Sequence, residues 1–156
     1  MKKFNDLVDE CSHEVTEIFP WDLEETLQER TPILLDIREP YEYNAMHIDG
    51  SINVPRGVLE SACEYDYEET VPELASGRDK EIVVICRSGK RSVLAAYTMK
   101  QLGFVNALSL KTGLRGWSEY EQPLVKSNGE RVDEDSADAY FAPRLRPEQK
   151  APRQEK

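Results

Sequence analysis

One short segment, Cys86-Arg-Ser-Gly-Lys-Arg-Ser92, combines a nucleophile with three cations and a glycine. It follows an apolar run and precedes a pattern typical of a helix, so we predict that it is a turn from a strand into a helix. In parallel sheets such turns lie at the edge where α/β folds bind ligands. The first turn of the helix adds unpaired amides and the positive end of the helix dipole. The segment therefore predicts an anion site that contains a cysteine.

Cys86 is the predicted nucleophile of this site. Gly89 lets the backbone curl so that successive amides converge on one point, and Arg87, Lys90 and Arg91 add positive charge. In such surroundings we expect a cysteine to be a thiolate at neutral pH, which needs no separate general base. We therefore predict attack by Cys86 on an anionic substrate. The alternative is a buried, inert cysteine beside a solvated basic turn.

Apolar periodicity predicts the elements that position this segment. The predicted strands are residues 15–18, 31–37, 81–86 and 107–110. The predicted helices are residues 4–11, 21–29 and 92–102, together with the segment around Trp117. Strands that alternate with helices favour an α/β fold, in which a parallel sheet has helices on both faces. The active loop would then lie between a central strand and a helix.

Composition divides the chain into three segments. Residues 1–14 are predicted to form an N-terminal amphipathic helix, and residues 15–125 a single α/β domain. Residues 126–156 mix charges with three prolines and contain few large apolar residues. Such a segment cannot bury enough apolar surface to offset the entropy lost on ordering. We therefore predict a disordered C-terminal tail.

Charge and hydropathy exclude several classes of function. The chain has 156 residues, 39% of them hydrophobic, which is enough for one core. Its net charge of −10 argues against nucleic acid and against an anionic membrane surface as partners. No apolar run approaches the roughly 20 residues that cross a bilayer, and the N-terminus lacks the apolar stretch of a signal peptide. We predict a cytoplasmic protein.

The cysteines and histidines predict neither disulfides nor a metal site. Three cysteines at wide spacing do not form a disulfide framework, and two histidines are too few for a protein-bound transition metal. We expect no cofactor. Cys63 is a candidate resolving thiol, but its neighbours Glu60, Glu64 and Asp66 would slow its attack. We therefore expect Cys63 to be structural.

Four segments, in this order, resemble the rhodanese (sulfurtransferase) family. They are Asp36-Ile-Arg38-Glu-Pro-Tyr-Glu42-Tyr, His47-Ile-Asp-Gly50-Ser-Ile-Asn53-Val-Pro55, the Cys86 segment and Gly113-Leu-Arg-Gly116-Trp117. The resemblance covers roughly residues 15–124 and implies a single rhodanese-like domain. One departure is Met46, since members of the family commonly have glycine just before the histidine.

The resemblance also implies an activity. In this family the loop cysteine takes a sulfane sulfur from thiosulfate or another persulfide donor. It holds the sulfur as a persulfide and passes it to cyanide, to a thiol or to a sulfur-carrier protein. Cys86 matches that nucleophile. The residues that match the substrate-binding loop are Arg87, Ser88, Gly89, Lys90 and Arg91.

Asp36 and Arg38 end the first apolar strand, so they should lie at the same sheet edge as Cys86. As supporting residues, Asp36 would brace the active loop and Arg38 would contact the anion. The alternative, which we favour, is a structural charge pair that fixes the turn after the strand. We expect His47 to be held by backbone groups of its own turn, because nothing spaces it as a base for Cys86.

Two other functions compete with sulfur transfer. A non-catalytic rhodanese-fold module that binds a protein would have no reason to keep Cys86 and its cations. Phosphatases and arsenate reductases of this fold use a longer loop, with an arginine six positions after the cysteine that grips phosphate oxygens. Here that position is Ser92, and the arginine comes five positions after Cys86. Sulfur chemistry is therefore favoured over phosphate chemistry.

Overall fold

The structure, a computed structural model, describes residues 1–153. Its strands are β1 (Thr16–Ile18), β2 (Ile33–Asp36), β3 (Ile52–Asn53), β4 (Ile82–Ile85) and β5 (Ala107–Leu110). They form one sheet in the order β1-β5-β4-β2-β3, and every neighbouring pair is parallel. The four predicted strands are confirmed, β5 with the predicted bounds and the other three with narrower ones. β3 was not predicted, because two residues carry no detectable periodicity.

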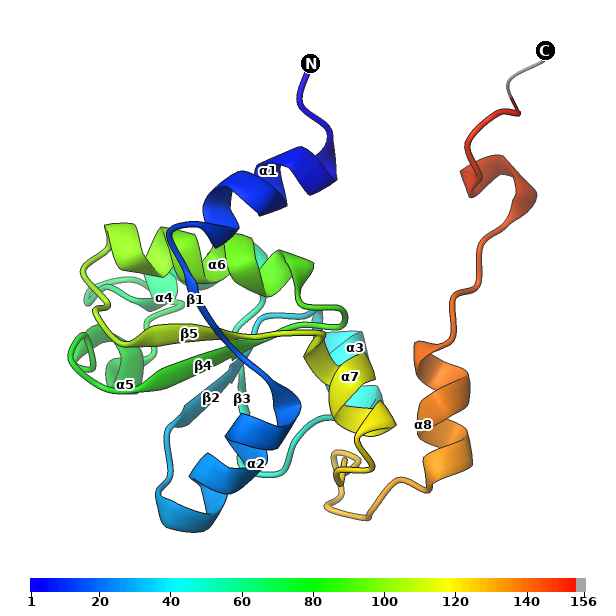
Figure 1. The fold of residues 1–156 in the computed structure, drawn as a ribbon. Coiled ribbons are helices and arrows are strands. Elements are labelled where there is room, and N and C mark those ends of the chain that lie inside the picture. Colours follow the sequence, from blue (N-terminus) through cyan, green and yellow to red (C-terminus); the bar gives the residue numbers. More distant parts are fainter. Residues whose placement is uncertain (154–156) are drawn as a thin grey trace.

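Helices cover both faces of this sheet, as predicted (Figure 1). They are α1 (Phe4–Ser12), α2 (Pro20–Glu29), α3 (Pro40–Ala45), α4 (Leu59–Ala62), α5 (Pro72–Ala75), α6 (Lys90–Gln101), α7 (Gly113–Glu119) and α8 (Glu134–Phe141). Two 3-10 turns, Arg56–Val58 and Pro147–Gln149, complete the regular structure. Within residues 1–153, no helix has the length and apolar character that a bilayer span requires.

The central strand β4 separates two apolar clusters. Ile82 and Val84 pack with α4, α5 and α6 on one face, whereas Val83 and Ile85 pack with α2, α7 and α8 on the other. Neighbouring residues of a strand point to opposite faces, so a strand that is apolar at every position must be covered on both sides. The loop after β4 therefore begins from the most buried part of the sheet.

The N-terminal helix α1 lies on the outer surface of α6. Val8 and Cys11 are buried there against Val93, and Lys100 of α6 pairs with Glu14 at 3.3 Å. The predicted amphipathic helix is therefore present and adds a layer outside the sheet (Figure 1).

The C-terminal segment differs from the prediction. Residues 126–156 were predicted to be disordered, but they contain α8, which packs against α7 (Figure 1). Val132, Ala137 and Phe141 are buried in the same cluster as α7. Asp133 caps the helix by accepting a hydrogen bond from the amide of Ser136 at 2.8 Å. These three apolar residues share one buried side, which composition alone does not reveal.

The same segment leaves α8 after Phe141 and continues as an extended arm towards residue 153 (Figure 1). Residues 154–156, on which the disorder prediction also falls, lie outside the described residues.

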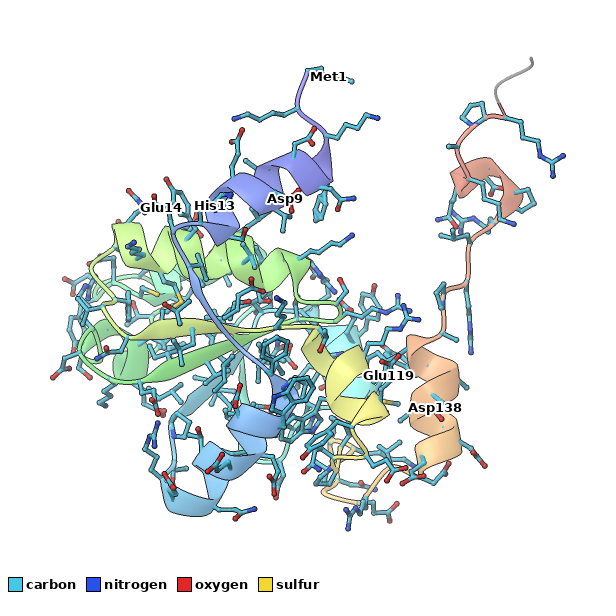
Figure 2. All side chains as sticks on the ribbon, viewed as in Figure 1. Met1, Asp9, His13, Glu14, Glu119 and Asp138 are labelled. Atoms are coloured by element: carbon cyan, nitrogen blue, oxygen red, sulfur yellow. The ribbon has the colours of Figure 1, made fainter. Side chains whose placement is uncertain are left out.

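The helices α7 and α8 have a cleft between them. Figure 2 shows the acidic side chains of Glu119 and Asp138, which line this cleft.

Candidate active site

The Cys86 loop connects β4 to α6, as predicted, and its thiol is completely buried. Cys86 Sγ accepts hydrogen bonds from the backbone amides of Gly89 at 3.1 Å and Ser92 at 3.2 Å. It also lies 3.3 Å from Ser92 Oγ, which in turn is 2.8 Å from Ser109 Oγ. Three polar groups therefore surround the sulfur, two of them fixed amide donors from the loop and the first turn of α6.

Gly89 is required for this convergence. Its φ is +87°, and a Cβ there would lie 2.8 Å from the backbone nitrogen of Thr112. Any other residue would face both left-handed strain and a backbone clash. The role predicted for Gly89, curling the loop so that amides meet at one point, agrees with this geometry.

The start of α7 holds the Cys86 loop in place through backbone hydrogen bonds. The amides of Leu114 and Arg115 donate to the carbonyl oxygens of Cys86 at 2.9 Å and Arg87 at 3.0 Å. A Cβ on Gly113 would lie 2.6 Å from the Cys86 oxygen and 2.5 Å from the Arg87 carbonyl group. Gly113 therefore allows the close approach of two backbones that holds the active loop in place.

Arg91 is held beside the loop by a buried acid. It forms two hydrogen bonds to the carboxylate of Glu42, at 2.9 and 3.0 Å. The hydrogen bond that Arg91 donates to Glu42 raises the pKa of Arg91, and the interaction with Cys86 adds to this effect. Burial alone would raise the pKa of Glu42, but Arg91 holds it below its usual value. The pair fixes the guanidinium of Arg91 at the side of the loop.

The other predicted loop residues point elsewhere. Arg87 Nη2 donates to the carbonyl oxygens of Phe141 at 3.1 Å and Ala142 at 3.3 Å, so Arg87 binds the end of α8. Ser88 and Lys90 are exposed on either side of the buried Gly89. The structure thus brings the amides of Gly89 and Ser92 to the Cys86 sulfur and binds Arg91 to Glu42 beside the loop. It places Arg87, Ser88 and Lys90 towards the outside of the loop.

Asp36 and Arg38 form a buried ion pair at the end of β2, with Arg38 Nη2 2.9 Å from Asp36 Oδ2. Arg38 also donates to the carbonyl oxygen of Met46 at 2.7 Å. In the described residues the Asp36 carboxylate accepts only from Arg38 and not from the loop, and Arg38 Nη1 is buried without a hydrogen-bond partner. This geometry matches the structural alternative, a pair that fixes the turn.

In the described part of the chain, neither His47 nor Cys63 forms a hydrogen bond with the Cys86 sulfur. His47 Nδ1 lies 2.8 Å from the carbonyl oxygen of Tyr43, and the two rings stack with centroids 3.8 Å apart. This agrees with a histidine held by its own turn. Cys63 is completely buried in the cluster below α4 and α5, and its burial raises its pKa to about 11.

Three contributors to the site were not predicted. Glu42 fixes Arg91, Ser109 completes the hydroxyl pair behind the sulfur, and the carbonyl groups after α8 fix Arg87. Only Glu42 had a sequence signal, because it lies in one of the segments that resemble the rhodanese family, although nothing in the sequence pairs it with Arg91.

Comparisons with known proteins agree with this fold and loop. The family model "Rhodanese-like domain" matches residues 20–120. The chain is 38% identical over 85 residues to the Bacillus subtilis protein "Putative sulfur carrier protein YrkF", covering 54% of this chain and 40% of that protein. It therefore spans less than half the length of this curated relative.

Solved structures show the same architecture. The human single-domain sulfurtransferase TSTD1 is 26% identical with a TM-score of 0.60, over 67% of this chain and 96% of that one. A Rhodopseudomonas palustris protein described as "Possible Tyrosine Phosphatase" is 25% identical with a TM-score of 0.68, over 79% and 94% of the two chains. Together with the family match over most of the sheet and the whole Cys86 loop, these likenesses show that the chain belongs to the rhodanese-like domain family.

Proposed function

We propose that the protein is a sulfurtransferase that carries sulfur as a persulfide on Cys86. The observation that carries the proposal is the convergence of the Gly89 and Ser92 amides on Sγ. A sulfur anion in a buried site is stabilised when donors are already in place and need no reorganisation. Relatives named as sulfur carriers and sulfurtransferases support sulfur transfer in general.

The proposed cycle has two displacements. In loading, the Cys86 thiolate attacks the outer sulfur of thiosulfate, the sulfur–sulfur bond of the donor breaks, and sulfite leaves with the electron pair. In transfer, an acceptor thiolate or cyanide attacks the outer sulfur of the persulfide. The new sulfur–sulfur bond of the enzyme then breaks, and Cys86 leaves as a thiolate. Charge and electrons balance in both steps, so no separate oxidant is needed.

The direct test is the intact mass of the reduced protein after incubation with thiosulfate. We expect a gain of one sulfur atom, which Cys86→Ser abolishes and Cys63→Ala retains. Loading by a polysulfide but not by thiosulfate would keep the persulfide and change the donor. Undiminished sulfur transfer by Cys86→Ser would overturn the mechanism. A folded wild-type protein that gains no sulfur from either donor would favour the non-catalytic binding module.

Phosphoryl transfer is the competing chemistry, since one structural relative is described as "Possible Tyrosine Phosphatase". In this loop the arginine five positions after Cys86 already forks onto the Glu42 carboxylate. The sixth position is Ser92, whose amide and hydroxyl contact the sulfur itself. The arginine that would fork onto phosphate oxygens is therefore already paired, which supports sulfur transfer over phosphoryl transfer. Release of phosphate from p-nitrophenyl phosphate at a rate above that of Cys86→Ser would contradict it.

A further inference from the structure

A cleft of about 710 Å³ lies between the Cys86 loop and the C-terminal segment. Its loop side includes Ser88 and Lys90, which flank Gly89, the residue whose amide donates to the sulfur. Its opposite wall is formed by residues 140–145. Sites of about 300–1,000 Å³ are typical of small-molecule ligands. The cleft therefore offers room for a ligand larger than thiosulfate directly beside the loop.

This cleft is positive although the protein is strongly negative. Four cations line it, namely Arg87, Lys90, Arg115 and Arg144, against a single acid, Glu42. The charge of that acid is already balanced by Arg91. The chain as a whole carries a net charge of −10, so this local concentration of cations is not explained by composition. Such a field attracts anions to one place on an otherwise repulsive surface.

Three of these cations have no buried partner among the described residues. Arg115 Nε lies 3.3 Å from the carboxylate of Glu119, and both side chains are exposed, so the pair is weak. Lys90 is exposed, and within residues 1–153 its ammonium group forms no hydrogen bond or ion pair. Arg144 is exposed as well, and in the described part of the chain it uses only Nη2, in a hydrogen bond to the carbonyl oxygen of Ala139. All three groups are therefore available to an incoming anion.

The outer wall is anchored to the loop itself. Arg87 binds the carbonyl oxygens of Phe141 and Ala142, and the ring of Phe141 is buried. Arg144 Nη2 donates to the carbonyl oxygen of Ala139 at 3.0 Å, which places its guanidinium at the end of α8. The family match ends at residue 120, so this wall and Arg144 lie outside the matched residues.

We propose that this cleft binds the anionic part of the sulfur acceptor, a small thiol that carries at least two carboxylate groups. Arg115 and Arg144 select it, because guanidinium groups bind carboxylates through two parallel hydrogen bonds. The proposal rests on the proposed function. The acceptor thiolate attacks the outer sulfur of the Cys86 persulfide, the bond to Cys86 breaks, and its electron pair returns to Cys86. The acceptor then leaves as a persulfide.

The test compares two acceptors after the persulfide has been loaded and verified by intact mass. Mercaptosuccinate carries two carboxylates, and 2-mercaptoethanol carries none. We expect kcat/KM, expressed per thiolate, to be about tenfold or more higher for mercaptosuccinate, as is typical of one or two charged hydrogen bonds. The preference should shrink as the salt concentration rises, because the cleft is open to solvent.

Variants locate the source of this preference. Arg144→Gln and Arg115→Gln should each lower the ratio of the two kcat/KM values about five- to tenfold. Arg144→Lys should restore part of the ratio, since it keeps the charge but loses the paired hydrogen bonds. Arg131→Gln is the matched control, because it removes one exposed arginine outside the cleft. It should leave the ratio unchanged.

The outcomes separate the two proposals. Normal loading with a ratio near one, or a ratio that Arg131→Gln lowers as much as Arg144→Gln, overturns the cleft as the acceptor site and leaves sulfur transfer standing. Failure of the wild-type protein to load sulfur from thiosulfate or polysulfide overturns the proposed function, and the inference falls with it.

Discussion

Cys86 and Cys63 are both completely buried members of the same apolar cluster, yet the polar groups around their sulfur atoms differ. Two amides and a hydroxyl surround the Cys86 sulfur. Cys63 lies among apolar side chains, and its burial raises its pKa to about 11, with Glu64 and Glu60 adding to the shift and Arg78 opposing it. Burial by itself therefore does not determine what a thiol can do in this fold. Fixed donors around the sulfur make the difference.

The largest difference that we expect between Cys86 and Cys63 is in the rate at which iodoacetamide alkylates them. With a pKa of about 11, the thiolate fraction of Cys63 at pH 8 is only about one in a thousand. We expect peptide mapping to find the label on Cys86, with Cys63 modified only after unfolding in urea. Equal labelling of the two cysteines in the folded protein would break the comparison.

Gly113→Ala should displace the loop that holds Cys86 and leave the surroundings of Cys63 unchanged. The new Cβ would collide with the carbonyl groups of Arg87 and Cys86 and displace the loop. Since a misplacement of about 1 Å can cost about a hundredfold in rate, we expect a loss of that order in sulfur transfer. Steady-state rates with thiosulfate measure it.

Gly50→Ala is the control for that substitution. Gly50 also has a positive φ, +83°, but a Cβ there meets nothing within 4 Å. It should cost about 1–2 kcal/mol of stability from the left-handed backbone and leave the rate unchanged. If Gly113→Ala behaves like Gly50→Ala, support from α7 does not matter to the sulfur.

Ser92→Ala isolates the hydroxyl from the amides. It removes one of the three polar groups at Sγ and keeps both backbone donors. We expect sulfur transfer to fall by up to about tenfold, in line with about 0.5–1.5 kcal/mol for one hydrogen bond. Ser109→Ala, whose hydroxyl contacts Ser92 rather than the sulfur, should have a smaller effect. The reverse order would show that the hydroxyl pair acts through packing.

Glu42→Gln should have the smallest effect and appear mainly in stability. Because Arg91 holds the pKa of Glu42 below its usual 4.5, the charged carboxylate stabilises the fold above pH 4.5. That contribution is lost as the pH falls through the lower native pKa. Urea unfolding measures the free energy of unfolding at pH 7 and at pH 3. We expect Glu42→Gln to reduce the difference between the two values by about 1 kcal/mol, a modest amount because solvent screens the partly exposed Arg91. An unchanged difference would contradict the role of the pair.

The strands and the active loop could be predicted because their signals are local. β4 is an unbroken apolar run, and Gly89 directly marks the turn that follows it. The direction of Arg87 could not be predicted, since its acceptors lie 54 and 55 residues further along the chain. The prediction of a disordered tail missed the helix α8 for the same reason. Its short apolar face is stabilised by contact with α7, and contacts between distant segments leave no pattern in composition.

The link between Arg87 and the end of α8 has a consequence for the order of events during synthesis. A ribosome synthesises the chain from the N-terminus to the C-terminus. The sheet, and the contacts by which α7 holds the Cys86 loop, can therefore form before residues 141 and 142 emerge. Until then, water must solvate the guanidinium of Arg87. The backbone contacts around the Cys86 sulfur can thus form early, whereas the outer wall of the cleft closes only after residues 141 and 142 have been made.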